Sequence, residues 1–391
     1  MTTFTSLFFD QGYCKIVEKI DKEKTIPLKD VLKIGKLTIV KKGKKGIGKE
    51  KTFLMTSKYL LNVSNSIKKD SKAVKVYCKA RIELNWLLLN YFTDSSDDKE
   101  GSPLLFHLIK ADKIIRLKAI NQIEFENWRQ LLTKYTIQQD FFERFDVVSV
   151  MGKGSSALVY KIRETATGEQ FACKRFKKSS LDKGSRKNLI KEINILRELK
   201  GEKHIVELHH VFESENSIYL IMELCEGKRC TLRNTLYQPK QMISLAYQIL
   251  KALKILKDKR IIHKDLKPDN ILLKYEDKPI DENEIRIVDF GLAVYSFEDN
   301  SKRRGGTVAY MAPEYLNDPH YIPNTKYDIY ALGVVLYNGL TGKKLFKGKT
   351  DKCMVRKNKE GFIDFTDSVI VNLSDKGEIN RNDSFKRTLS F

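Results

Sequence analysis

The chain of 391 residues is long enough for two domains of average size. Hydrophobic residues make up 41% and charged residues 31%, a balance that allows a packed core and excludes global disorder. The formal net charge of +22 favours anionic partners, although a lysine-rich solvated surface explains it equally well.

The cysteines are scattered and show no metal-binding or disulfide pattern. They are Cys14, Cys78, Cys173, Cys225, Cys230 and Cys353. No Cys-x-x-Cys pair or Cys/His cluster with zinc-ligand spacing occurs, so a reducing compartment is indicated. The first residues lack the pattern of a signal peptide, and no apolar run is long enough to span a bilayer. We therefore expect a cytoplasmic protein whose membrane contact is at most peripheral.

The chain divides into three parts: an unassigned extension (1–31), a first domain (32–137) and a second domain (145–391). Strand-like segments of the first domain lie at 36–40, 52–55, 59–63, 104–109 and 114–117. Apolar residues then recur with roughly helical spacing around Trp128. The first domain is therefore predicted to consist of several strands followed by one helix.

The second domain changes in character along its length. It opens with a strand-like run at 146–150 and continues with strands and a helix around 185–199. From about Gln241 it becomes mostly helical, beginning with a long amphipathic helix that contains Leu245 and Leu256. The chain as a whole is therefore predicted to be of the α+β class.

A glycine-containing stretch from Met151 to Val159 joins two strand-like runs of this domain. Glycines there let the backbone lie close over phosphate groups, with its N–H groups aimed at them, although an ordinary hairpin would look similar. Lys174 follows 15 residues after Val159, and Glu192 follows 18 residues after Lys174. A lysine on a strand can hold phosphate oxygens while a glutamate on a facing helix fixes its position.

Chemically informative residues are concentrated in His-Lys-Asp-Leu-Lys-Pro-Asp-Asn, residues 263–270, and in the Asp-Phe-Gly that begins at Asp289. Phosphoryl transfer requires a carboxylate near the attacking hydroxyl and oxygen ligands for Mg²⁺. Asp265 suits the first role, while Asn270 and Asp289 suit the second. Mg²⁺ prefers few protein oxygens together with phosphate oxygens, which one Asn and one Asp can satisfy.

With these motifs in this order, residues 145–349 resemble the eukaryotic protein kinase family. The resemblance implies a two-lobed fold with a β-rich N-lobe and a helical C-lobe, and transfer of a phosphoryl group from ATP·Mg²⁺ to protein substrates. Asp265 would be the catalytic base, and Lys267 would neutralise the transferring group. A lysine at that position resembles serine/threonine kinases. Asn270 and Asp289 would hold Mg²⁺.

The resemblance also implies which residues surround ATP. They are Met151, Gly152, Lys153, Gly154, Ser155, Ser156, Ala157, Leu158, Val159, Ala172, Lys174, Glu192, Met222, Glu223, Cys225 and Leu272. Lys174 would bind the α- and β-phosphates and pair with Glu192. Met222 would be the gatekeeper, and the backbone of Glu223 and Cys225 would hold adenine.

Further positions are implied around the activation segment. Thr307 and Glu314 would lie near its end, and Asp328 would anchor the catalytic loop. The chain departs from the family at Lys264, where an arginine is usual; lysine keeps the charge but loses the bidentate fork that binds a phosphorylated activation loop. After Gly377 the sequence is polar with little helical periodicity, so we expect a shortened C-lobe.

The first domain, with strands followed by one helix that carries Trp128, resembles a pleckstrin-homology domain. That resemblance implies a β-sandwich or barrel with a carboxyl-terminal helix. Lysines concentrate after its first strand, at Lys41, Lys42, Lys44, Lys45, Lys49 and Lys51. Such a loop could bind anionic phosphoinositide lipid, but the second strand lacks the arginine usual in lipid-binding members. Without that arginine, a protein-interaction or autoinhibitory role is favoured over specific phosphoinositide binding.

The preferred interpretation is an ATP-dependent serine/threonine protein kinase with an amino-terminal pleckstrin-homology-like domain. Its rival is a kinase-like scaffold that binds partners or anionic lipid and turns over poorly because its C-lobe is incomplete. Nucleic-acid binding ranks third, because no nucleic-acid motif accompanies the basic residues.

Overall fold

The computed structural model describes residues 17–40, 48–92, 104–110, 113–154, 157–227, 237–298, 305–318, 320–346 and 348–361. The chain forms two compact units. The first comprises Met1–Asp182 with Leu208–Glu223, and the second Lys183–Glu207 with Leu224–Phe391.

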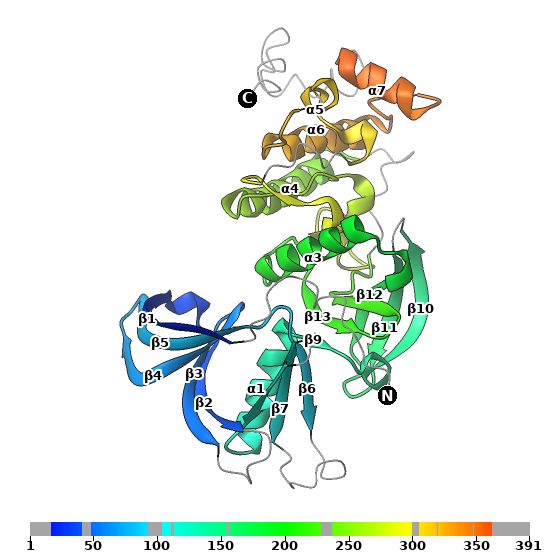
Figure 1. The fold of residues 1–391 in the computed structure, drawn as a ribbon. Helices are drawn as coiled ribbons and strands as arrows, with labels where there is room; N and C mark the ends of the chain where they lie inside the picture. The colour runs from blue at the N-terminus through cyan, green and yellow to red at the C-terminus, as the bar shows by residue number, and fades with distance from the viewer. Residues whose placement is uncertain are drawn as a thin grey trace. The chain divides into compact units, whose positions relative to one another are not determined.

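The described residues of the first unit form one hydrogen-bonded sheet of 14 strands. Across the sheet the strands are β1 (Glu18–Pro27), β5 (Ala73–Glu83), β4 (Tyr59–Lys69), β3 (Lys49–Met55), β2 (Lys33–Val40), β8 (Lys113–Lys118), β7 (Leu105–Lys110), β6 (Leu88–Phe92), β9 (Ile137–Gln138), β13 (Leu208–Glu213), β14 (Ser217–Met222), β12 (Gln170–Lys177), β11 (Leu158–Glu164) and β10 (Phe145–Lys153) (Figure 1). Neighbours pair antiparallel, except where β9 pairs parallel with β6 and β13.

Helix α1 (Gln122–Tyr135) is the predicted helix of the first domain. It begins where the Asn121 side chain accepts a hydrogen bond from the Glu124 N–H at 2.8 Å, as expected of an N-cap. Its Trp128 is fully buried in a core supplied by strands β2 to β8. A Cβ at Gly35 of β2 would lie 3.1 Å from the Trp128 ring, so the absence of a side chain there makes room for the indole.

Part of the extension that the sequence left unassigned belongs to this sheet. Strand β1 pairs antiparallel with β5, and its Ile26 is buried with residues of β3, β4 and β5. Along β5, Val74, Val76 and Cys78 are buried while alternate residues face outward, the period of two expected of a half-buried strand. Residues 18–27 are thus part of the same sheet as the first domain.

Strand β9 joins the strands of the first domain to strands β10 to β14. Ile137 pairs with Leu88 of β6 on one side and with Val211 of β13 on the other. The sandwich or barrel that the resemblance implied for residues 32–137 stays a prediction. The two-residue strand makes the hydrogen bonding continuous across the first unit.

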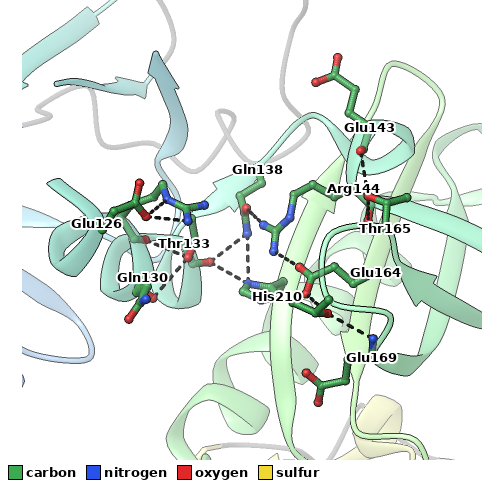
Figure 2. A network of polar contacts seen from close by, with 12 residues as sticks. Glu126, Gln130, Thr133, Gln138, Glu143, Arg144, Glu164, Thr165, Glu169 and His210 are labelled. Atoms are coloured by element: carbon green, nitrogen blue, oxygen red, sulfur yellow. Dashed lines mark hydrogen bonds and ion pairs between the residues drawn. The ribbon is translucent and has the colours of Figure 1, made fainter. Parts of the chain in front are cut away.

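Polar side chains reinforce this junction, as Figure 2 shows. Arg144, at the end of α2 (Phe141–Arg144), donates to Gln138 Oε1 at 2.6 Å and to Glu164 Oε1 at 2.7 Å. Gln138 donates in turn to the Thr133 carbonyl at 3.0 Å, and its Nε2 lies 3.2 Å from His210 Nδ1. Burial opposes ionisation of Glu164, but the Arg144 and Thr167 hydrogen bonds hold its pKa below the ordinary value.

An aromatic cluster lies next to these polar groups. The Phe141 ring stacks on Tyr219, with centroids 4.1 Å apart, and also contacts Phe145 and Phe212. All four rings belong to one buried core among strands β10 to β14. Phe141, which precedes residues 145–349 in the sequence, is therefore part of the packing of these strands.

The second unit is mostly helical in its described part. Its helices are α3 (Lys183–Glu198), α4 (Pro239–Asp258), α5 (Pro313–Asn317), α6 (Lys326–Thr341) and α7 (Asp351–Glu360), with two short strand pairs, β15 (Ile261–Ile262) with β18 (Val294–Tyr295) and β16 (Ile271–Leu273) with β17 (Ile285–Ile287). Helix α3 corresponds to the helix predicted around 185–199, and α4 corresponds to the long amphipathic helix predicted from about Gln241. Among the described residues, no helix is long and apolar enough to cross a membrane.

Several predictions fall on residues that the structure does not describe. They concern Ser155, Ser156, Lys41, Lys42, Lys44 and Lys45. The segment 362–391, which carries the expectation of a shortened C-lobe, also lies outside the described residues.

Candidate active site

The Asp265 carboxylate, in the loop 263–270 of the second unit, accepts hydrogen bonds from four donors. Oδ1 accepts from the Thr307 N–H at 3.0 Å and from the Thr307 hydroxyl at 2.7 Å. Oδ2 accepts from Lys267 Nζ at 2.7 Å and from Asn270 Nδ2 at 3.1 Å. Both oxygens are therefore fixed in position, and a positive charge lies beside one of them.

Buried groups position the backbone of this loop. The Asp328 carboxylate of α6 accepts from the His263 N–H at 2.8 Å and from the Lys264 N–H at 3.0 Å, which is the anchoring that the resemblance implied. Burial raises the pKa of Asp328, and the two N–H groups oppose that rise. His263 Nε2 lies 3.0 Å from the Val288 carbonyl, and its ring meets Phe290 edge-on.

Asn270 and Asp289, the two predicted Mg²⁺ ligands, come from adjacent strand ends. Strand β16 pairs with β17 from Ile271 and Ile287, and the Val288 N–H donates to the Asn270 carbonyl at 3.0 Å. The Asn270 amide nitrogen is engaged with Asp265, which leaves its Oδ1 as the oxygen for a metal. An exposed carboxylate and one amide oxygen are the hard donors that Mg²⁺ prefers, so these residues fit the ion.

Asp289 has a left-handed backbone conformation, with φ 62° and ψ 73°. Such a conformation is uncommon outside glycine, although aspartate tolerates it better than most residues. Next to it, a Cβ at Gly291 would lie 3.3 Å from Asp289 Oδ1 and 3.5 Å from Glu192 Oε2. Glu192 of α3 is buried, and its Oε2 lies near Gly291 of the Asp-Phe-Gly turn.

Lys264, which replaces the usual arginine, is buried rather than presented to solvent. Its side chain is 2% exposed, and Nζ lies 5.6 Å from the centroid of the Tyr315 ring. The Tyr315 hydroxyl accepts from the Gly305 N–H at 2.9 Å. Lys264 thus contacts the Tyr315 ring, and the Tyr315 hydroxyl in turn binds the backbone at Gly305.

The implied nucleotide-binding residues of the first unit lie on adjoining strands. The glycine-containing stretch is the β10–β11 hairpin, in which Gly152 pairs with Val159 and the Gly154 N–H donates to the Ala157 carbonyl at 2.8 Å. Val159 lies directly across from Lys174 of β12. The hairpin and the predicted phosphate-binding lysine are therefore neighbours in one sheet.

Other implied ATP contacts are distributed between the two units. Ala172 of β12 pairs with Met222 of β14, and Glu223 directly follows that strand. Leu272 lies on β16 and Cys225 is buried in the second unit. Lys174 and Glu192 belong to different units, and their pairing stays a prediction.

Burial also acts on the Cys173 thiol beside Lys174. It raises the pKa of Cys173 to about 12, and Arg175 only partly opposes this rise. The thiol is therefore protonated at neutral pH and behaves as an apolar core residue rather than a nucleophile.

Asn358 of α7 is a site residue that the sequence reasoning missed. Its side chain is fully buried and bonds to the backbone that follows Thr307. Helix α7 is otherwise polar, with charged residues over most of its length. A lone asparagine in such a helix gives no sequence signal of burial.

Comparison with known proteins agrees with this geometry. The protein kinase domain family matches residues 145–389. Calcium-dependent protein kinase 33 of Arabidopsis thaliana is 34% identical over 220 residues, which are 55% of this chain and 41% of that protein. Serine/threonine-protein kinase ULK3 of Xenopus laevis is 37% identical over 213 residues, which are 53% of this chain and 44% of that protein.

The chain belongs to the protein kinase domain family, since the match covers more than half of its residues. The match confirms the prediction of a protein kinase domain, and one of the relatives is named a serine/threonine-protein kinase. The match also continues through most of the segment where a shortened C-lobe was expected. The chain spans less than half the length of either relative named above.

Proposed function

We propose that this chain transfers the γ-phosphate of ATP to serine and threonine hydroxyls of protein substrates. The arrangement around Asp265 is the observation that carries the proposal. Its Oδ1 accepts a hydrogen bond from the hydroxyl of Thr307, the contact that a substrate hydroxyl would make while it loses its proton. Lys267 Nζ lies 2.8 Å from the same hydroxyl oxygen, where it would offset negative charge on the transferring group.

ATP·Mg²⁺ would supply the phosphoryl group and neutralise part of its charge. Asn270 and Asp289 would hold the metal, and Lys174 would hold phosphate oxygens. The chain's own residues orient the reactants: the glycine hairpin would cover the phosphates, and Asp265 would orient the acceptor hydroxyl. Family membership supports the use of ATP and Mg²⁺ in general.

Phosphate transfer to a generic protein substrate tests the proposal. The purified full chain is incubated with radiolabelled ATP and Mg²⁺, and Asp265→Asn is expected to lower transfer by about 10²-fold or more. Asp258→Asn is the matched control, because Asp258 is exposed at the end of α4 and pairs only with nearby Lys254 among the contacts described. Label that survives Asp265→Asn would identify a contaminating kinase.

The same assay decides the rival function, a kinase-like scaffold with weak turnover. A folded chain that binds ATP but transfers no phosphate would support the scaffold. Binding is measured as a rise in melting temperature on addition of ATP and Mg²⁺.

For the first domain we propose a pleckstrin-homology-like module in a cytoplasmic protein, with peripheral contact to phosphoinositide membranes. The succession of strands and one helix around Trp128 supports it, as do Lys49 and Lys51 on β3, which follow the lysine-rich segment 41–45 in the sequence. Sedimentation of the full chain with phosphatidylcholine vesicles, with or without phosphoinositide, tests the proposal. Lys49→Ala/Lys51→Ala should reduce phosphoinositide-dependent binding.

Lys254→Ala/Lys257→Ala on α4 removes the same charge from the second unit and controls for net charge. Equal binding to both kinds of vesicle would instead favour a protein-interaction or autoinhibitory role for the first domain.

A further inference from the structure

Asn358 joins three elements of the second unit through one buried amide. Its Nδ2 donates to the Met311 carbonyl at 2.7 Å and to the Val308 carbonyl at 3.1 Å. Its Oδ1 accepts from the Tyr330 hydroxyl of α6 at 2.7 Å. The side chain therefore links α7 and α6 to the segment Val308–Met311, with every contact satisfied at 0% exposure.

The segment Val308–Met311 continues directly from Thr307, which donates to Asp265 from both its N–H and its hydroxyl. Residues Val308, Ala309 and Tyr310 form a single 3₁₀ turn and are only partly buried. A polypeptide that brings a hydroxyl to Asp265 must pass next to this turn. The turn is thus a partly exposed surface that such an acceptor polypeptide would contact.

Other contacts also hold this turn: the Tyr310 N–H donates to the Thr307 carbonyl at 2.8 Å, and the Val308 and Tyr310 side chains pack against the buried core that contains Met311. Asn338 Nδ2 of α6 donates to the Tyr310 hydroxyl at 3.4 Å. The Oδ1 atom of Asn338 accepts from the Leu345 N–H at 2.8 Å. The two bonds from Asn358 act on the turn's main chain at both ends, because Val308 begins it and Met311 follows it. They set the path of the backbone rather than of one side chain.

We propose that Asn358 is a positioning residue for the protein substrate: it fixes the turn that follows Thr307, and thereby the place of the acceptor polypeptide beside Asp265. This inference rests on the proposed phosphoryl transfer. An asparagine suits the role because its amide offers two donors for the carbonyls and an acceptor for Tyr330. Aspartate has almost the same shape but lacks both donors.

Steady-state kinetics of Asn358→Asp and Tyr330→Phe in the full chain test the inference. Asn358→Asp keeps the acceptor for Tyr330 and loses the two bonds to the turn. Tyr330→Phe is the matched control, because it removes the third bond and leaves the two carbonyl contacts in place. KM and kcat are measured for an acceptor peptide and for ATP, and folding is checked by thermal melting.

Asn358→Asp is expected to raise KM for the peptide about tenfold while KM for ATP changes less than about twofold. Tyr330→Phe is expected to lower the melting temperature and to leave both KM values within about twofold. If the buried carboxylate prevents folding, Asn358→Leu removes the same two donors without a charge, and the same split between KM values is expected.

Three other results overturn the inference. The first is an unchanged peptide KM in a folded Asn358 variant. The second is an equal rise in peptide and ATP KM, which would indicate general loosening of the C-lobe. The third is an equal peptide effect in Tyr330→Phe. Failure of the proposed function is distinct, because the unsubstituted chain would then transfer no phosphate at all.

Discussion

The hydroxyl of Thr307 donates a 2.7 Å hydrogen bond to Oδ1 of Asp265, across 42 positions of sequence. Lys267 Nζ lies within 2.8 Å of both partners, at 2.7 Å from Asp265 Oδ2 and 2.8 Å from the Thr307 hydroxyl. The three side chains form a closed set of contacts between the catalytic loop and the end of the activation segment. The loop and the segment therefore depend on each other for position.

Thr307→Val tests the contribution of the Thr307 hydroxyl apart from that of the Thr307 N–H. Valine matches threonine in shape and keeps the N–H bond to Asp265, so only the hydroxyl's two contacts are lost. We expect kcat for peptide phosphorylation to fall about tenfold or more, since one charge-assisted hydrogen bond is lost at the reacting carboxylate. Thr307→Ser restores the hydroxyl and should keep kcat within about threefold; an active Thr307→Val would contradict the role.

Gly306 is required next to Thr307 for two reasons. Its φ of +127° is a conformation that other residues rarely adopt, and a Cβ there would lie 2.9 Å from the Lys264 carbonyl oxygen. Gly306→Ala should therefore move Thr307 away from Asp265 and lower kcat markedly, at a stability cost of about 1–3 kcal/mol.

Gly168→Ala controls for the backbone strain alone. Gly168 has φ +74°, but nothing lies within 4 Å of the position of an added Cβ. Gly168→Ala should lower the melting temperature and leave kcat unchanged. If both variants lose activity equally, strain rather than the contact with Lys264 explains Gly306.

The candidate catalytic residues stand out in the sequence because the chemistry of phosphoryl transfer imposes a short, ordered motif. Asp265, Lys267 and Asn270 lie within six residues of one another, and the structure brings all three together. Asp289 was predicted as their partner across a longer interval, and the β16–β17 pairing explains how it arrives there. Function thus constrained residue type and spacing together.

The missed features depend on contacts between distant segments. Strand β5 was not among the predicted strands, although its alternation of buried and exposed residues is a pattern that sequence analysis can detect. Strand β9 is different, because it has only two residues. Its pairing is decided by Leu88 and Val211 on either side, and no local pattern could reveal it. Asn358 is similar, since its burial arises from Tyr330 and from carbonyl groups about 50 positions away.

Arg144 should be important for the stability of the first unit. Arg144→Met keeps the apolar stem but removes both hydrogen bonds, so Gln138 Oε1 loses its donor and Glu164 keeps only the Thr167 hydroxyl among the contacts described. Leaving a buried acceptor without a donor costs about 1–3 kcal/mol, and we expect a loss of that size in urea unfolding.

Arg163→Met on β11 is the matched control for Arg144. Arg163 pairs with Asp146 at 3.7 Å, and both side chains are more than half exposed. Such a surface pair contributes little, so its loss should change stability by less than about 0.5 kcal/mol. Equal effects of the two substitutions would mean that the Arg144 bonds add nothing beyond an ordinary surface charge.

His204 should make the stability of the second unit depend on pH. It is buried, Nδ1 has no partner among the described residues, and its pKa is lowered by burial and then by Lys203 and Arg286. Lys251 acts in the same direction, whereas Glu284 opposes the shift. The folded chain therefore resists binding a proton that the unfolded chain accepts near pH 6.5.

The sign of the effect follows from that difference. Stability from neutral His204 is fully present above about pH 6.5 and is lost as the pH falls toward the lowered folded-state pKa. His204→Asn removes the titrating group but tolerates the φ of +66°, because asparagine adopts left-handed conformations readily, and the His204 carbonyl can still accept from the Ile287 N–H. Melting temperatures of both proteins are measured at pH 7.5, 6.5 and 5.5. The chain with His204 should lose more on acidification than His204→Asn, since every other titrating group is common to both; parallel curves would show that His204 does not resist protonation in the folded state.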